Sequence, residues 1–332
     1  KAFKENDMNR NGDKSDELPL ADDKNYRAFN NLLNTFIDFN PKVNYINVDN
    51  GKLTFAYADD RWKEGLLYVQ KLVKEGLFTP VSFTMTTEQL QTLAANEENK
   101  IGSFSWTSTS LIPGTSSRQP EYELVLLEGK EGFTNITYSP TLAVDRYFIT
   151  KNCKNPEVAF RIGDLMCSED MTIWSRWGEK GVDWEVPEPG TPSLYDFMGY
   201  KAMLRPILVW GTPQNSHWNN TTPGFRTYEV AAGMVADGDK SQISKATAMK
   251  TLLNHIPKET VSSLTFTSEE LEEYNEIVQV AESYANEQRI AFVTGNQDIN
   301  AGWDKYISEL NNIGINRAIE IAQKAYDRMK KN

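Results

Sequence analysis

A short polar loop near the start of the chain has the residue types and spacing of a calcium site. Asp7, Asn9 and Asn11 occupy alternate positions, and Gly12 follows them directly. Calcium prefers roughly six to eight oxygen ligands. This arrangement supplies three side-chain oxygens, a sharp glycine turn and the backbone carbonyl of Asp13 as a fourth ligand. The spacing therefore predicts a calcium-binding loop.

A carboxylate from Asp16 or Glu17 would close the coordination shell. Leu18 stands at the twelfth position, where an EF-hand has a bidentate glutamate, so the loop is not a standard EF-hand. Loops of Asp, Asn and Gly are also common as plain solvated turns, and that alternative stays open on the sequence alone.

Tryptophans beside hydrogen-bonding side chains predict a carbohydrate site. Sugar rings have apolar C–H faces rimmed by hydroxyl groups, so they bind against flat aromatic rings with polar neighbours. A run of serine and threonine residues follows Trp106, whereas Trp210 and Trp218 lie in a stretch rich in proline, glycine and asparagine. These three and Trp177 are candidate sugar-binding residues. Arg226 is a candidate for contacts to sugar hydroxyls or to a carboxylate.

Other tryptophans fit the hydrophobic core better. Trp62 lies on the apolar face of a predicted amphipathic helix, and Trp303 lies at the start of a later helix. For Trp174, Trp177 and Trp184 the sequence does not decide between core and ligand contact.

Composition argues against several classes of function. The formal net charge of −11 would repel nucleic acid and anionic membrane surfaces, and it mildly disfavours acidic sugars. No run of 18 apolar residues is present, and two histidines do not make a zinc cluster. A hydrolase using two of Glu179, Asp183 and Glu185 remains an alternative, as does a calcium-dependent docking module, although a dockerin would need a duplicated loop.

The elements that would position these residues alternate between short strands and helices, which favours an α/β fold. At 332 residues the chain exceeds the size at which one core stops growing, so two lobes are expected. We expect a hairpin around Asp49-Asn50-Gly51, strands at 101–106 and 122–127, and an extended run at 141–150. We expect helices within 26–37, 62–73 and 86–95, after Asn155, and in 268–287, 303–310 and 316–331. Cys153 and Cys167 are separated by a predicted helix, so both should be free thiols.

Several segments together resemble family 1 extracellular solute-binding proteins of carbohydrate ABC transporters, in the lipoprotein branch that includes the alginate-oligosaccharide-binding proteins. The resemblance covers nearly the whole chain. It rests on residues 3–12, 16–20, 63–66, 74–77, 149–159, 181–184, 304–306 and 323–328.

This resemblance implies a two-lobed, periplasmic-binding-protein-like (type II) α/β fold that holds a sugar in the cleft and delivers it to an ABC permease, without enzyme activity. Trp106 resembles the strand-end tryptophan that stacks on sugar in maltose-binding-like proteins, and Trp218 loosely resembles a second one. The loop departs from the calcium-binding branch by one extra residue before the Asp16-Glu17 pair, so the resemblance assigns no role to Ser15. That branch implies a structural Ca²⁺ with ligands at Asp7, Asn9, Asn11, Asp13 through its carbonyl, Asp16 and Glu17.

The resemblance also implies that the family's first segment, the N-terminal part of one lobe, is absent from this chain. We expect 1–143 to form the lobe with the calcium loop, and 144–332 to form the remainder of the other lobe, hinge crossings and C-terminal helices. Either a partner fragment supplies the missing part or the protein is truncated. The expected location is the extracellular face of a bacterial cell membrane, through a lipid anchor in the missing part, or the periplasm.

Overall fold

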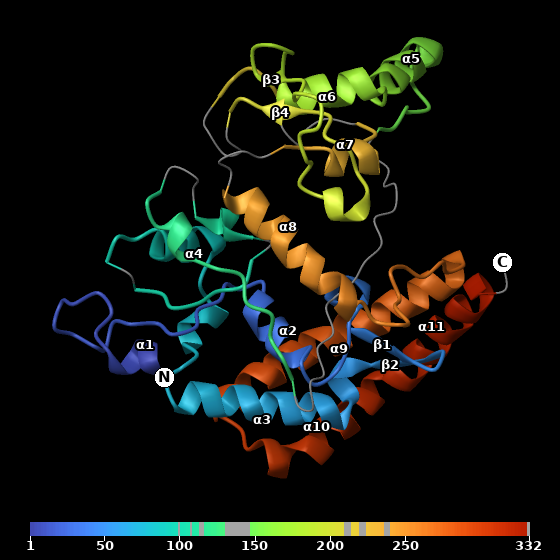
Figure 1. Cartoon of the computed structure of the whole chain (residues 1–332). Helices are drawn as coiled ribbons and strands as arrows, with labels where there is room; N and C mark the ends of the chain where they lie inside the picture. The colour runs from blue at the N-terminus through green and yellow to red at the C-terminus, as the bar shows by residue number, and fades with distance from the viewer. Residues whose placement is uncertain are drawn as a thin grey trace. The chain divides into compact units, whose positions relative to one another are not determined.

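The computed structural model describes residues 1–98, 100–106, 108–112, 116–129, 147–208, 214–218, 224–235 and 240–330. Its contacts divide the chain into two compact units (Figure 1). Unit 1 comprises Lys1–Trp106, Val125–Pro140 and Leu252–Asn332, and unit 2 comprises Thr107–Leu124 and Thr141–Thr251. The predicted boundary at residue 143 does not coincide with this division, because the chain returns to unit 1 at Leu252 and its last helices pack against the first ones.

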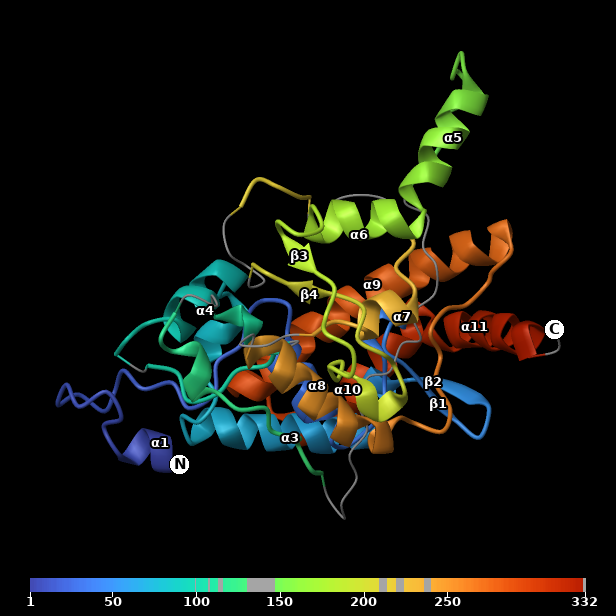
Figure 2. The same cartoon turned by 45° about the horizontal axis from the view of Figure 1, so that its top comes forward.

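Unit 1 is mostly helical. Figures 1 and 2 show its three last helices lying side by side, with the hairpin of β1 and β2 next to α11. Its elements are α1 (Ala2–Glu5), α2 (Arg27–Leu33), β1 (Ile46–Asp49), β2 (Lys52–Phe55), α3 (Asp60–Lys74), α4 (Thr87–Ala94), α9 (Ser268–Thr294), α10 (Ile299–Ile313) and α11 (Ile315–Lys330), with short 3-10 turns at Pro41–Val43, Ala56–Ala58, Pro80–Phe83 and Leu253–His255.

Capping residues explain where these helices begin and end. Asp59 accepts a hydrogen bond from the first turn of α3, and reciprocal capping boxes at Thr86 and Thr267 open α4 and α9. Gly76 and Gly314 follow α3 and α10 with φ of +65° and +108°, a left-handed conformation that favours glycine. The predicted helices in this unit are confirmed, although α9 runs further than expected.

The predicted hairpin is confirmed. Asn50 and Gly51 both have positive φ, 50° and 77°, as the two central residues of a type I′ turn require. The strands pair antiparallel, with Ile46 opposite Phe55 and Asp49 opposite Lys52.

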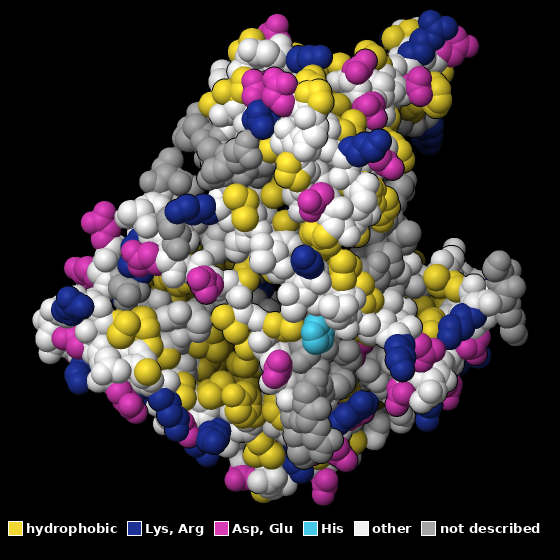
Figure 3. Space-filling view, viewed as in Figure 1, with side chains coloured by type: hydrophobic (Ala, Val, Ile, Leu, Met, Phe, Trp, Pro, Cys, Tyr) yellow, Lys and Arg dark blue, Asp and Glu magenta, His cyan; other side chains and the backbone are white. Residues whose placement is uncertain are grey.

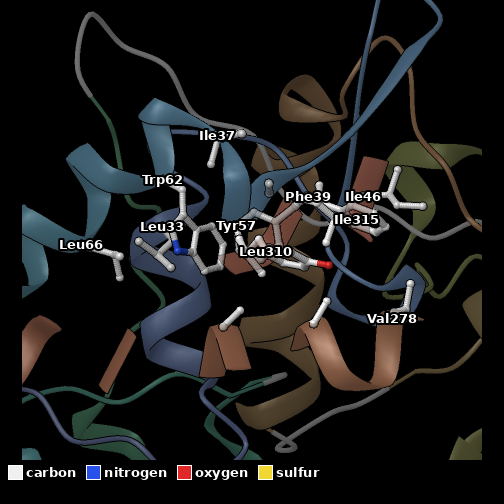
Figure 4. Packing of buried hydrophobic residues seen from close by; sticks show 14 of the residues in the cluster. Leu33, Ile37, Phe39, Ile46, Tyr57, Trp62, Leu66, Val278, Leu310 and Ile315 are labelled. Atoms are coloured by element: carbon white, nitrogen blue, oxygen red, sulfur yellow. The ribbon is translucent and has the colours of Figure 1, made fainter. Parts of the chain in front are cut away.

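The core of unit 1 is built from helices and strands that are far apart in the sequence. Figure 4 shows side chains of α2, α3, α9, α10, α11 and β1 packing in one cluster. Trp62 is 2% exposed and Trp303 is 4% exposed, so both belong to this core as predicted. The residues labelled in Figure 4 are Leu33, Ile37, Phe39, Ile46, Tyr57, Trp62, Leu66, Val278, Leu310 and Ile315.

The expected strands at 101–106 and 122–127 are wrong. Ile101 makes one isolated parallel bridge with Leu18, and no strand is present in 122–127. An alternating pattern becomes a strand only where a partner strand supplies a ladder of hydrogen bonds. Within the described residues, both sheets are two-stranded and antiparallel. The described structure is therefore mostly helical and has fewer strands than the predicted α/β fold. The extended run at 141–150 falls largely outside the described residues.

Unit 2 has a smaller core. Trp177, Leu204, Val230 and Met234 are its clustered buried side chains. Its elements are α5 (Pro156–Met166), α6 (Glu169–Trp177), β3 (Trp184–Glu185), β4 (Arg205–Pro206), α7 (Tyr228–Ala232) and α8 (Lys240–Leu252), with 3-10 turns at Thr109–Leu111, Gln119–Glu121 and Asp196–Met198.

Helix α5 carries exposed apolar side chains, including Phe160 and Leu165, and Figure 3 shows hydrophobic side chains between charged ones over this helix, at the upper right. Cys153 and Cys167 flank α5 as free thiols, as predicted. Among the described helices, none combines the length and apolar composition of a membrane span.

Candidate functional site

The loop of residues 7–17 turns back on itself around Asp7. One carboxylate oxygen of Asp7 accepts the Asn11 N–H at 3.1 Å, and the other accepts the Gly12 N–H at 2.9 Å. Arg10 and Gly12 have positive φ of 57° and 88°, which tightens the turn. The side chain of Asp7 therefore organises the loop from inside.

Asp16 lies opposite the two asparagines of the loop. Its carboxylate accepts hydrogen bonds from Asn9 Nδ2 at 3.3 Å and from Asn11 Nδ2 at 3.0 Å. The amide oxygens of both residues accept backbone N–H groups, Asn9 Oδ1 that of Asn11 at 3.1 Å and Asn11 Oδ1 that of Asp13 at 2.7 Å. Turning an amide oxygen toward Asp16 would therefore exchange one of these hydrogen bonds for a cation contact. Lys100 lies 3.4 Å from Asp16, so one cation already neighbours this carboxylate.

Glu17 is the buried acid of the loop, with an exposed fraction of 4%. Its Oε1 accepts the Met8 N–H at 2.8 Å, while Oε2 is buried and makes no hydrogen bond within the described part of the chain. A buried acceptor without a partner costs about 1–3 kcal/mol, and more when it is charged. A bound cation would remove that cost.

Ser15 and Asp13 form a local turn at the far end of the loop. The Asp13 carboxylate accepts both the N–H and the hydroxyl of Ser15, at 2.8 and 2.6 Å. These two hydrogen bonds lower the pKa of Asp13 below its ordinary value. With its side chain engaged by Ser15, Asp13 retains its backbone carbonyl as the oxygen available for a ligand.

The donor types in this loop are those of a hard-cation site. No group of three or more His, Cys, Asp or Glu residues in the described ranges is arranged to hold a metal ion. The loop instead combines carboxylates with amide and carbonyl oxygens, a mixture that calcium accepts and that transition metals do not prefer.

Trp106 is half-buried in unit 1, with a guanidinium on its ring. Arg27 Cζ lies 4.1 Å from the ring centroid, and Arg27 is held by an ion pair with the buried carboxylate of Asp23. Asn31 donates to Ser105 Oγ at 2.6 Å, which ties the preceding residue to α2. Arg27 is not among the residues predicted from the sequence. Its i,i+4 spacing from Asp23 signals only the ion pair, not the contact with Trp106.

Trp218 and Trp174 form an exposed aromatic pair in unit 2. Their exposed fractions are 53% and 46%, and their ring centroids lie 6.2 Å apart in an edge-to-face arrangement. The Trp218 N–H donates to the Ser175 carbonyl at 2.8 Å, which anchors the pair to α6. The third candidate of this stretch, Trp210, lies outside the described residues.

Trp177 is 4% exposed and packs in the core of unit 2, which corrects its assignment as a sugar-stacking surface. Its ring instead contacts two guanidinium groups, with Arg176 Cζ at 5.0 Å and Arg226 Cζ at 5.6 Å from its centroid. Arg226 is exposed, and it donates to the Ala231 carbonyl at 3.3 Å.

The carboxylates considered for hydrolysis have structural roles. Asp183 is buried and accepts the Glu179 N–H at 2.8 Å and the Ser216 hydroxyl at 2.9 Å. The Glu179 hydrogen bond, with that from Ser216, lowers the pKa of Asp183, whereas a glycosidase general acid needs a raised pKa. Glu185 pairs with Arg205 at 3.2 Å across β3 and β4. These contacts argue against the hydrolase alternative.

Sequence comparison finds a curated relative of this chain, and no protein-family model matches. The chain is 24% identical over 345 residues to the fructooligosaccharide ABC transporter substrate-binding protein FusA of Streptococcus pneumoniae. The match covers the whole chain but only 61% of FusA.

Solved structures with the same fold are also longer than this chain. The structure of FusA in complex with kestose has a TM-score of 0.75 and 22% identity, with 100% of this chain and 67% of FusA covered. An EF-hand mutant of FusA in complex with fructo-nystose matches with a TM-score of 0.72.

An HMO-binding solute-binding protein from Bifidobacterium longum infantis gives a TM-score of 0.75 at 17% identity. The match covers 98% of this chain and 67% of that protein. The alginate-binding protein AlgQ2 without calcium ion gives a TM-score of 0.66 at 19% identity. This match covers 98% of this chain and 66% of AlgQ2. All these proteins are named as binding proteins, in agreement with the prediction of a non-enzyme. Sequence and fold together identify the chain as a relative of the solute-binding proteins of carbohydrate ABC transporters, corresponding to about two thirds of their length.

Proposed function

We propose that the chain is part of an extracellular solute-binding protein that captures an oligosaccharide and delivers it to an ABC permease. The observation that carries this proposal is the similarity of the entire chain, in sequence and in fold, to FusA. The contacts of Asp183 and Glu185 support a binding role over hydrolysis. The corresponding location is the extracellular face of a bacterial membrane, through a lipid anchor outside this chain, or the periplasm.

Capture would use aromatic side chains in each unit. In unit 1 the surface is Trp106 with Arg27 on its ring, and in unit 2 it is the pair of Trp174 and Trp218. Sugar C–H faces pack on such rings, and their hydroxyl groups bond to the polar neighbours. A ligand that contacts both lobes stabilises the closed form by its differential contacts, and the closed form is the one that docks on the permease.

The two-lobed arrangement is part of the same proposal. Unit 1 would correspond to one lobe and unit 2 to a portion of the other. Two observations support this: more than a third of FusA in the sequence comparison, and a third in the solved structure, lies outside the matched region, and α5 exposes Val158, Phe160, Ile162 and Leu165. Amide hydrogen exchange tests it, because an uncovered α5 should exchange much faster than α9. Equal protection of the two helices would contradict an incomplete lobe.

Calorimetric titration of the full chain with a panel of oligosaccharides tests the binding function. The panel should include kestose and other fructooligosaccharides, neutral milk-type oligosaccharides and acidic oligosaccharides. The expected result is saturable binding of one class with no change in the sugar, checked by chromatography of the recovered ligand. Hydrolysis of a sugar, or no binding to any member of the panel, would refute the proposal.

We further propose that the loop of residues 7–17 binds a structural calcium ion. The orphaned Oε2 of Glu17 and the convergence of Asn9 and Asn11 on Asp16 support it. Two of the similar solved structures are described as an EF-hand mutant of FusA and as AlgQ2 without calcium ion. The ligands would be Asp7, Asn9, Asn11, the Asp13 carbonyl, Asp16 and Glu17. The ion would supply positive charge that holds these oxygens together, and calorimetric titration of chelator-treated protein with CaCl2, against MgCl2, tests its binding.

A further inference from the structure

The ring of Trp106 in unit 1 is supported by a guanidinium that is itself held in place. Arg27 Cζ lies 4.1 Å from the centroid of the ring, within the range of a cation–π contact. Arg27 also forms an ion pair with Asp23, whose side chain is completely buried. The Arg27 side chain is 36% exposed, so the contact lies at the surface of the unit. Because the guanidinium covers one face of the ring, a sugar would stack on the opposite face.

Three further hydrogen bonds fix the carboxylate of Asp23. The Thr87 hydroxyl donates to Oδ2 at 2.6 Å, the Asn25 N–H donates to Oδ1 at 3.1 Å, and Asn25 Nδ2 donates to Oδ2 at 2.9 Å. Thr87 is the first residue of α4. The buried carboxylate therefore joins the start of α2 to the start of α4, and it holds the guanidinium of Arg27 in one position.

The start of α2 departs from two local preferences. Tyr26, which precedes the helix, has φ of 57°, a left-handed conformation that disfavours residues other than glycine. Arg27 is the first residue of the helix, where the helix dipole disfavours a positive charge. Arg289 of α9 is 2% exposed, and its Cζ lies 4.0 Å from the centroid of the Tyr26 ring, so a buried side chain holds Tyr26 in place. Such departures concentrate at functional sites.

The backbone that leads to Trp106 is anchored separately from its ring. The Ala21 N–H donates to the Ser103 carbonyl at 3.0 Å, and the Ser103 hydroxyl donates to the Pro19 carbonyl at 2.7 Å. These hydrogen bonds and that of Ser105 with α2 place the main chain up to residue 105. The contact with Arg27 then restrains the orientation of the Trp106 ring itself.

We infer that Arg27 is a positioning residue for sugar binding, which holds the Trp106 ring in the orientation that stacks on a sugar. This inference rests on the proposed capture of an oligosaccharide. A ring that is already held in its bound orientation loses less conformational freedom on binding, so Arg27 increases the affinity through Trp106. The ion pair with Asp23 balances the charge of Arg27, so this support adds no net charge to the surface.

Near-UV circular dichroism of the ligand-free chain tests the restraint on the ring. The chain has eight tryptophans, so the contribution of Trp106 is taken as the difference between the native spectrum and that of Trp106→Ala. The same difference is measured in the Arg27→Gln background. A fixed aromatic ring gives a near-UV signal that a mobile one loses, so the Trp106 contribution should fall by about half or more in that background.

Calorimetry tests the effect on binding with a double-mutant cycle. The full chain is titrated with kestose, or with the tightest-binding member of the oligosaccharide panel if kestose does not bind. Arg27→Gln should weaken binding by about 5-fold or more. In the Trp106→Ala background, Arg27→Gln should have no further effect, because Arg27 acts through the ring.

Two variants separate positioning from a general structural role. Arg27→Lys keeps a positive charge beside Asp23 without the planar guanidinium, so its affinity should lie between those of the native chain and Arg27→Gln. Arg61→Gln is the control, because Arg61 makes a similar ion pair, with Asp59 at 2.8 Å, at the start of α3. It should leave the affinity and the Trp106 signal unchanged. Thermal melting of each variant shows that it is folded.

The outcomes separate this inference from the proposed function. An unchanged affinity or an unchanged Trp106 signal in Arg27→Gln overturns the positioning role and leaves sugar capture intact. Equal losses of affinity with and without Trp106 also overturn it, because Arg27 would then act independently of the ring. Failure of every oligosaccharide in the panel to bind the native chain overturns the proposed function, and this inference with it.

Discussion

Replacement of Glu17 by glutamine should abolish most of the stabilisation that calcium gives to this protein. The amide oxygen of glutamine can still accept the Met8 N–H that Glu17 Oε1 accepts at 2.8 Å. The change removes only the negative charge and converts the orphaned Oε2 into a group that cannot bind a cation. Because the side chain is buried, no nearby solvent-exposed acid can take its place.

The magnitude follows from linkage. If the loop binds calcium with a Kd of about 10 µM, 1 mM calcium stabilises the folded state by about 2.7 kcal/mol. For a folding unit of the size of unit 1, each kcal/mol shifts the melting temperature by about 2–4 °C. The native chain should therefore melt about 5–10 °C higher in calcium than in chelator, and Glu17→Gln should show a shift of about 2 °C or less.

Differential scanning fluorimetry with EGTA, CaCl2 and MgCl2 measures these shifts. Asp13→Asn is a matched control from the same loop, because its side chain bonds Ser15 and the proposed ligand is its backbone carbonyl. It should keep most of the calcium response. Equal calcium shifts in the native chain and in Glu17→Gln, or no shift in either, would show that the buried carboxylate does not bind a cation.

The remaining predictions concern the sugar surface, the core and pH. Trp106→Ala should lower the affinity for the bound oligosaccharide about 10-fold or more. The melting temperature should change little, because Trp106 is only half-buried. Calorimetry measures the affinity and thermal melting the stability, and an unchanged affinity contradicts the assignment. Leu66→Ala should destabilise unit 1 by about 2–5 kcal/mol in urea unfolding because Leu66 is fully buried, whereas Val81→Ala, at an exposed residue, should change stability by less than about 0.5 kcal/mol. Burial raises the pKa of Asp38 to about 6, so the folded state binds more protons than the unfolded state between pH 4 and 6, and stability should fall as pH rises through that window and level off above it. Asp38→Asn should flatten this slope in urea midpoints measured from pH 4 to 7, and an unchanged slope contradicts the burial argument.

Local signals in the sequence were sufficient for much of unit 1. A type I′ turn needs positive φ at two adjacent residues, and Asn50 and Gly51 adopt it readily. This pair of residues alone predicts the hairpin turn. Thr267 with a glutamate three residues later marks the start of α9 as clearly in the sequence as in the structure. The free thiols, too, followed from helix length alone.

Features that depend on tertiary packing were not predictable in the same way. The apolar alternation before Trp106 indicated a strand, but only the spatial neighbours decide whether a ladder forms, and here Leu18 offers a single bridge. Trp177 and Trp174 lie on the same short helix, and the sequence does not show which ring faces the core. The contact of Arg27 with Trp106 joins residues that no local pattern relates.

The path of the chain through unit 1 also has a consequence for its synthesis on the ribosome. Helix α3 packs against α9, so the core of this unit needs side chains that lie on either side of residues 107–251. At about 5–20 residues per second, translation of that intervening stretch takes about 7 to 30 seconds. During this interval the apolar faces of α2 and α3 lack the side chains of α9 that cover them in the folded unit. A chaperone that binds extended chains would therefore bind these segments. Nascent chains stalled before residue 268 should therefore be sensitive to protease, and release after α11 has emerged should make them resistant.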